Sequence, residues 1–244
     1  MYQISRKGKD LKGEINISGS KSESNRLLIL RAYTSYFNIL NISDSDDTKT
    51  VMDALESNNE EINIGHAGTA MRFLTSYYSS ISNSKKILTG SSRMKNRPIS
   101  LLVEALNELG CDIEYIDKIG YPPIKINGKL ISNNTVSLPA NISSQYISSL
   151  MMLGVSLENG LNIKLSTKIT SLPYILMTKR IIERIGGSVQ INSNYINIQQ
   201  LKSKTITDQN VESDWSSASY FFSLAALSNY SDITLSTFFK DSIQ

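Results

Sequence analysis

The sequence has little of the chemistry that metal and redox sites require. Its 244 residues contain one cysteine, Cys111, and one histidine, His66. A single cysteine cannot form a disulfide within the chain, and without a cysteine–histidine cluster a zinc site is not expected. A serine–histidine–aspartate triad would have to use His66, and no G-x-S-x-G motif presents a nucleophilic serine. The composition therefore predicts a protein with no metal site and few or no cofactors.

Long apolar runs and a strong charge bias are also missing. No run reaches the roughly 20 residues that a membrane helix needs, and the first seven residues lack the apolar stretch of a secretory signal. The 25 basic and 22 acidic residues leave a net charge of +3, which is too small to predict a nucleic-acid partner. Walker-type and Rossmann-type glycine loops are absent as well. We expect a cytoplasmic protein that binds neither membrane nor nucleic acid, although a local basic pocket would suit a small anion.

What the chain does contain is an internal repeat. Pro98 begins an apolar-periodic helix that ends at Gly110, and residues 111–115 alternate as a strand does. The same order returns later, where Pro173 begins a helix and Gly186 follows its end. Each of these helices is preceded by another helix and strand. The repeating unit is therefore helix, strand, helix, and then one or two strands.

Three copies of this unit fit between about Lys21 and Gln200, and a fourth begins near Val211. The fourth copy reaches its first strand at residues 232–235, and its second helix and closing strands do not follow. A sheet cut at this point would stay half-buried, so we expect a truncated form of a longer protein. Alternatively, the tail pairs with an N-terminal strand at residues 2–5 to form a small stub. The two interpretations are compatible.

Several predicted helices begin with small hydroxyl residues or glycine beside a cation. The first turn of a helix offers unpaired N–H groups and a partial positive charge, and both suit phosphate or carboxylate groups. Taken one at a time, three of these starts are more typical of ordinary capping residues and solvated charges, and the basic segment 88–98 fits a solvated loop equally well. Together they indicate a ligand with several anionic groups. The four segments are residues 19–26, 66–72, 88–98 and 143–145, and Ser171 and Asp214 precede two further helices.

In their sequence and order, these segments resemble the N-terminal part of the 5-enolpyruvylshikimate-3-phosphate (EPSP) synthase family. The resemblance spans nearly the whole chain. It rests on the motifs Gly19-Ser20-Lys21-Ser22, Asn25-Arg26, Ala67-Gly68-Thr69-Ala70-Met71-Arg72, Leu88-Thr89-Gly90, Arg93-Met94, Arg97-Pro98-Ile99, Ser143-Ser144-Gln145, Ser171, Pro173-Tyr174, Asp214 and Ser216-Ser217-Ala218-Ser219-Tyr220.

This resemblance implies the fold class, which is α/β. The family has the enolpyruvyl transferase fold, an inside-out α/β barrel in which each of two lobes contains three βαβαββ repeats. Residues 21–212 would form one complete lobe, which binds shikimate 3-phosphate. Residues 1–20 and 213–244 would be fragments of the other lobe. The family's members use no metal and no organic cofactor, and we expect a monomer.

The implied reaction is enolpyruvyl transfer from phosphoenolpyruvate to the 5-hydroxyl of shikimate 3-phosphate, in the shikimate pathway to chorismate and aromatic amino acids. By motif position, Lys21 would be the catalytic residue and would contact both substrates. The residues implied for shikimate 3-phosphate are Lys21, Ser22, Arg26, Ser143, Ser144, Gln145, Ser171 and Tyr174. Those implied for phosphoenolpyruvate are Lys21, Gly68, Arg93 and Gln145.

Two positions depart from the family's usual pattern. His66 stands where asparagine is common, and Phe73 stands where proline is common. An imidazole can replace one amide hydrogen bond but is bulkier, so the phosphoenolpyruvate side of the site is expected to be altered. Gly68 is retained, as in members sensitive to glyphosate, an inhibitor of the phosphoenolpyruvate site. A complete protein is therefore expected to be sensitive too.

The part of the family's chain that has no counterpart here matters more for activity than these two positions. The family's acid/base carboxylates and several of its phosphoenolpyruvate-binding cations would lie outside these 244 residues, so the chain alone is expected to bind shikimate 3-phosphate weakly and to turn over nothing.

One alternative is the UDP-N-acetylglucosamine enolpyruvyl transferase, which shares the fold but has Lys-Asn in place of Lys21-Ser22 and a loop cysteine as its acid. The other is a single-lobe anion-binding module without turnover.

Overall fold

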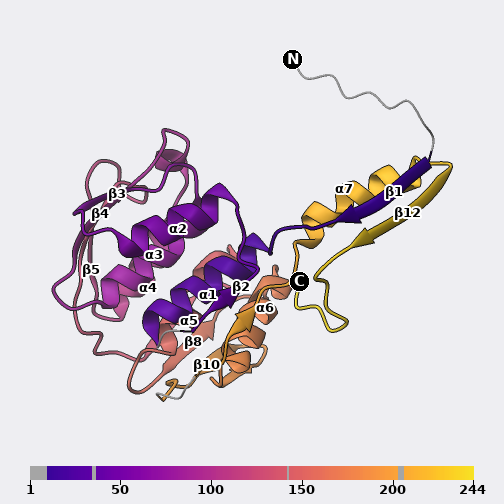
Figure 1. Ribbon diagram of the computed structural model, residues 1–244. Helices are drawn as coiled ribbons and strands as arrows, with labels where there is room; N and C mark the ends of the chain where they lie inside the picture. Colours follow the sequence, from indigo (N-terminus) through magenta and orange to yellow (C-terminus); the bar gives the residue numbers. More distant parts are fainter. Residues whose placement is uncertain (1–9, 35–36, 142, 203–205) are drawn as a thin grey trace.

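The computed structural model describes residues 10–34, 37–141, 143–202 and 206–244. Within these residues the chain forms a main body, residues 20–212, in which helices pack together on the inside and sheets lie on the outside (Figure 1). A narrow extension made of one helix and two strands projects from the body (Figure 1). No helix in the described part of the chain combines the length and apolar character needed to cross a bilayer.

The helices begin and end close to the residues that the sequence indicates. Pro173 occupies the first turn of α6, and Gly186 follows its end with a φ of 92°, a conformation that glycine adopts without strain. Ser45, ahead of α2, accepts a hydrogen bond from the backbone N–H of Thr48 and so satisfies an unpaired donor of the first turn. The helices are α1 Lys21–Tyr33, α2 Asp46–Glu56, α3 Gly68–Ser80, α4 Ser100–Glu108, α5 Ser144–Gly154, α6 Leu172–Arg184 and α7 Trp215–Ala226.

Two four-stranded sheets of the body share one topology, which confirms the predicted repeat. In the order β3-β4-β6-β5, the first pair is parallel and the next two are antiparallel. The order β7-β8-β10-β9 repeats both the sequence of pairings and their directions. The strands of the first sheet are β3 Glu61–Asn63, β4 Lys85–Thr89, β5 Asp112–Tyr115 and β6 Ile124–Asn127, and those of the second are β7 Thr135–Leu138, β8 Leu161–Leu165, β9 Val189–Ile191 and β10 Tyr195–Ile198.

The first copy of the repeat is built differently from the other two. Its strand β2, Ile39–Leu40, pairs in parallel with β11, Gln209–Asn210, at the far end of the body. The copies are therefore linked in a ring: β3 passes from the first copy into the sheet of the second, and β7 from the second into that of the third. The α/β fold with helices inside is the predicted one.

Helix α1 lies at the centre of this ring. Eight consecutive residues, from Glu23 to Leu30, are buried, because α2, α3, α5 and α6 all pack against the helix. A helix buried all round normally carries apolar residues on every side. In α1 the second half does so, with Leu27, Leu28, Ile29 and Leu30 almost fully buried. The first half instead buries polar groups, and those groups need partners.

The extension joins the body where two chain segments cross. Gly19 forms a β-bridge with Ser213, and the N–H of Ser20 donates to the carbonyl of Glu212 at 2.8 Å. Beyond this crossing, β1 (Asp10–Ile15) and β12 (Tyr230–Leu235) pair in parallel beside α7. The predicted N-terminal strand at residues 2–5 lies outside the described residues. The described partner of β12 is β1, which the sequence analysis did not identify as a strand.

Candidate functional site

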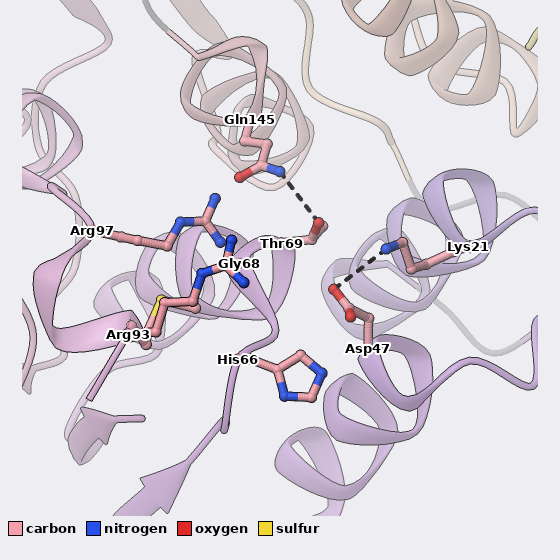
Figure 2. A pocket seen from close by; sticks show the side chains of 9 residues that line it. Lys21, Asp47, His66, Gly68, Thr69, Arg93, Arg97 and Gln145 are labelled. Carbon is pink, nitrogen blue, oxygen red and sulfur yellow. Dashed lines mark hydrogen bonds and ion pairs between the residues drawn. The ribbon is translucent and has the colours of Figure 1, made fainter. Parts of the chain in front are cut away.

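A pocket of about 340 Å³ opens where α1, α3 and α5 begin (Figure 2). Its walls also include the start of α2 and the segment after β4. Nine residues line it, and they are Lys21, Asp47, His66, Gly68, Thr69, Arg93, Met94, Arg97 and Gln145.

The sheet that contains β3 and β4 explains why distant residues meet in this pocket. The two strands are parallel neighbours, so their carboxyl ends lie at the same edge. The loops that follow are tied together, because the N–H of Ser91 donates to the carbonyl of Gly65 at 2.8 Å. One loop leads into α3 through His66, and the other carries Arg93 into a short 3-10 helix, Met94–Asn96. The fold therefore places a helix start beside a cationic segment.

Charge in this pocket is strongly one-sided. Three cations line it, namely Lys21, Arg93 and Arg97, whereas Asp47 is the one carboxylate in the lining. The Lys21 ammonium lies 3.8 Å from the Asp47 carboxylate, with both groups reached by water. The amino end of α3 adds a partial positive charge. A pocket with this balance is suited to a small anion with more than one charged group.

Beside the pocket, Arg26 forms a buried polar centre between α1, α5 and α6. The residue is 2% exposed, and its guanidinium donates to the Thr178 hydroxyl at 2.7 Å, the Ser148 hydroxyl at 3.1 Å and the Ser22 carbonyl at 2.8 Å. All three acceptors are neutral. Burial lowers the pKa of Arg26 to about 10, and Tyr174 partly opposes this shift. A buried cation without a counter-ion among the described residues is costly unless an anion reaches it.

Two aromatic rings face this guanidinium. Its Cζ lies 5.4 Å from the centroid of Phe73 and 5.9 Å from that of Tyr174, both within the range of a cation–π contact. Phe73 is fully buried and is not among the residues that line the pocket. Phe73, which replaces the family's common proline, therefore packs against Arg26. His66, which replaces the common asparagine, lines the pocket itself.

The structure brings together the four residues implied for phosphoenolpyruvate, since Lys21, Gly68, Arg93 and Gln145 line one pocket. Gln145 reaches across to α3, where its side-chain amide donates to the Thr69 hydroxyl at 3.4 Å. The other implied residues lie outside this lining. Ser22 contacts Arg26 through its carbonyl, Tyr174 through its ring, Ser143 and Ser144 stand at the start of α5, and Ser171 stands at the start of α6. Their roles toward a ligand stay predictions.

Sequence reasoning missed Asp47 as a pocket residue. It belongs to the acidic run at the start of α2, where carboxylates ordinarily complement the helix dipole. That common pattern gives no indication that one of them faces a lysine on another helix. Thr69 and Met94 were quoted only within the motifs, and Arg97, whose planar guanidinium suits carboxylate or phosphate, was not assigned to a substrate.

Cys111 is not placed to act in this pocket. It is 8% exposed within the core, immediately before β5, and it is absent from the pocket lining. Burial raises the pKa of its thiol to about 12. A thiol that stays protonated and covered is a poor acid or nucleophile, which argues against the alternative that relies on a catalytic cysteine.

Comparison with known proteins identifies the family. The family model described as EPSP synthase (3-phosphoshikimate 1-carboxyvinyltransferase) matches residues 5–57 and 55–244. Two relatives named 3-phosphoshikimate 1-carboxyvinyltransferase, from Bacteroides fragilis strains YCH46 and ATCC 25285, are 43% and 44% identical over 235 and 236 residues. Each alignment covers 96% of this chain and 57% of the relative. The chain thus spans little more than half the length of these relatives.

Solved structures agree on the fold. Two structures of EPSP synthase from Acinetobacter baumannii superpose with a TM-score of 0.79 at 21% sequence identity. They cover 96% of this chain, and the chain covers 57% and 58% of theirs. At this identity the likeness is evidence for the fold alone.

Proposed function

The chain belongs to the EPSP synthase family, and from that premise we propose that the protein containing it transfers the enolpyruvyl group of phosphoenolpyruvate to the 5-hydroxyl of shikimate 3-phosphate. The hydroxyl oxygen loses its proton and adds to C2 of phosphoenolpyruvate, while C3 gains a proton. The intermediate then loses phosphate and a C3 proton to give EPSP. The observation that carries the proposal is the convergence of Lys21, Gly68, Arg93 and Gln145 on one cationic pocket.

The pocket supports the phosphoenolpyruvate part of this proposal through its charge. Lys21 and Arg93 offer charge-assisted hydrogen bonds to phosphate or carboxylate oxygens. Gly68 begins α3, so its backbone faces the pocket with the unpaired N–H groups of a first helical turn. Gln145 adds a neutral donor from the opposite wall. Phosphoenolpyruvate, with a phosphate and a carboxylate, matches this arrangement.

Arg26 supports the shikimate 3-phosphate part. Its buried guanidinium lacks a carboxylate partner among the described residues, and the shikimate carboxylate would supply the missing anion. Tyr174 is 48% exposed beside Arg26 and presents a ring that could cover the carbocycle. We assign the hydroxyls of Ser22, Ser143, Ser144 and Ser171 to the phosphate and the ring hydroxyls. Lys21, which begins α1 between the two regions, is assigned to both substrates as the catalytic residue.

We further propose that residues 21–212 form the shikimate-3-phosphate lobe and that residues 1–20 and 213–244 belong to the other lobe. These 244 residues alone should bind shikimate 3-phosphate but not turn over, because the matched relatives contain a further 43% of chain with no counterpart here (100% minus the 57% covered). We expect the complete protein to be a cytoplasmic monomer that glyphosate inhibits.

A chimera tests the reaction. The 244 residues are joined to the remainder of the Bacteroides fragilis relative, and phosphate release is measured with both substrates, with that relative as the positive control. The proposal predicts turnover that Lys21→Met abolishes. A folded chimera that binds shikimate 3-phosphate but releases no phosphate would instead indicate an anion-binding module.

A further inference from the structure

Arg97 occupies a space that only a glycine at position 68 leaves free. A Cβ built on Gly68 would lie 2.2 Å from Nη1, 2.8 Å from Cζ and 2.9 Å from Nη2 of Arg97. The three nearest atoms thus all belong to one guanidinium, which rests directly on the first residue of α3. Figure 2 shows the Arg93 and Arg97 side chains reaching toward Gly68 from the same side of the pocket.

The Arg97 guanidinium has no hydrogen bond or ion pair with another described residue. Its neighbour Arg72 differs in this respect. Arg72 is 3% exposed and donates to the carbonyls of Gly68 at 3.3 Å and Pro98 at 2.9 Å. Arg72 is therefore a structural cation held by the backbone, whereas the donors of half-buried Arg97 are directed into the pocket and are open to a ligand.

The position of Arg97 is electrostatically unfavourable in the absence of an anion. The amino end of a helix repels a cation, and α3 begins directly beneath the guanidinium. Arg93 and Lys21 line the same pocket, and the charge of Arg97 helps burial to lower the pKa of Arg72. The one carboxylate in the lining, Asp47, pairs with Lys21 instead. An anion between these cations and the helix start would relieve the repulsion.

We propose that Arg97 is a further anion-binding residue of this pocket, which grips phosphate or carboxylate oxygens together with Arg93 above the start of α3. The inference rests on the proposed function for the identity of the physiological ligand, phosphoenolpyruvate. It also gives Gly68 a specific role: the missing side chain leaves room for the guanidinium. A larger residue at position 68 acts on ligand binding by displacing Arg97.

The test follows the backbone amide of Gly68 by NMR while the 244-residue chain is titrated with inorganic phosphate and, separately, with phosphoenolpyruvate. In Arg97→Gln the dissociation constant of both ligands should rise about tenfold, as expected for loss of a charge-assisted hydrogen bond. Lys95→Gln is the matched control, because Lys95 is an exposed cation two residues away that does not line the pocket. It should change binding less than about twofold.

A double-mutant cycle tests the role of Gly68. Gly68→Ala should weaken phosphate binding in the wild-type background and add little further loss in Arg97→Gln. Equal affinities of wild type and Arg97→Gln, or no saturable shift at Gly68 in wild type, would overturn the inference. If phosphate binding depends on Arg97 while shikimate 3-phosphate produces no heat in calorimetry, the proposed function fails and the inference on Arg97 stands.

Discussion

Glu23 is a charged residue that α1 buries completely. This carboxylate has no exposed surface and accepts a hydrogen bond from Arg184 Nη2 at 2.6 Å, which ties α1 to the last turn of α6. The backbone N–H of Glu212 donates to its other oxygen at 3.3 Å. Burial, the largest influence, raises the pKa of Glu23 above its ordinary value of 4.5, although the Arg184 charge opposes the shift.

A raised pKa makes stability depend on pH in a definite direction. Just above pH 4.5 the folded chain holds the Glu23 proton more tightly than the unfolded chain does. The contribution of Glu23 to the free energy of unfolding is therefore fully present below pH 4.5 and is lost as pH rises through the folded pKa. Urea unfolding from pH 4.5 to 7.5 should show the stability of wild type, relative to Glu23→Gln, falling with pH.

The exposed Glu104 provides the control for this experiment. Glu104→Gln should follow the wild-type pH profile, because it leaves the contact between Glu23 and Arg184 in place. If the stability of wild type relative to Glu23→Gln rises with pH, the Arg184 charge affects the Glu23 pKa more than burial does. That result would contradict this account of the contact between α1 and α6.

At the residue scale, sequence reasoning found side chains that stand in motifs and missed those that act through packing. Gly68, Arg93 and Gln145 were named because they stand in family motifs close to predicted helix starts. Glu23 and Asp47 were not, because their partners Arg184 and Lys21 are on other helices, and no local pattern reveals a contact between distant segments. Arg97 was noticed, yet its contact with Gly68 depends on a loop geometry that sequence alone does not give.

The two segments that cross between the body and the extension leave little room for a larger side chain. A Cβ on Gly19 would lie 1.8 Å from the carbonyl oxygen of Asn41 and 2.8 Å from Cγ1 of Val211. The first of these is a backbone atom in the turn after β2 and cannot move aside easily. Gly68→Ala meets only the end of a flexible arginine side chain, so the two glycines form a matched pair.

We therefore expect Gly19→Ala to lower the free energy of unfolding by about 2 to 3 kcal/mol, since overpacking against backbone forces the chain to shift. Gly68→Ala should stay within about 1 kcal/mol of wild type, because alanine suits a helix and Arg97 can swing away. Urea denaturation of both variants measures the difference. Similar losses for the two would show that the crossing has room to relax.

At the element scale, capped helices with clear apolar periodicity were predictable, and short strands were not. The limits of α6 follow from Pro173 and Gly186, which act locally. The pairing of β2 with β11 involves two residues on each side, more than 160 positions apart, and such short strands carry no alternation to detect. The predicted repeat implied a second helix in its first copy but did not locate α2, although the Ser45 cap and the acidic first turn are typical of a helix start.

For the whole molecule, the repeat was predictable and its closure was not. Two copies share one sheet topology, as expected when similar sequences form similar units. The first copy completes its strand pairing with β11 only after the chain has passed through the other two, so the ring depends on the whole body rather than on any one unit. This ring brings the starts of α1, α3 and α5 to one pocket.

The extension differs from the body in how it buries apolar surface. In α7 only Ala218 is buried, and large apolar residues such as Tyr220, Phe222 and Leu227 are more than half exposed. The body, by contrast, packs most of its apolar residues into one continuous core. We therefore expect ligand binding by residues of the body to depend little on α7.

The central claim is that this chain carries a site for shikimate 3-phosphate, and calorimetric titration of the 244 residues with that ligand tests it most directly. Shikimate is the matched control ligand, since it keeps the ring and carboxylate but lacks the phosphate. We predict saturable single-site binding of shikimate 3-phosphate, with shikimate at least about tenfold weaker because the phosphate's charge-assisted hydrogen bonds are lost. No heat with shikimate 3-phosphate at millimolar concentration, or equal affinity for both ligands, would contradict the claim.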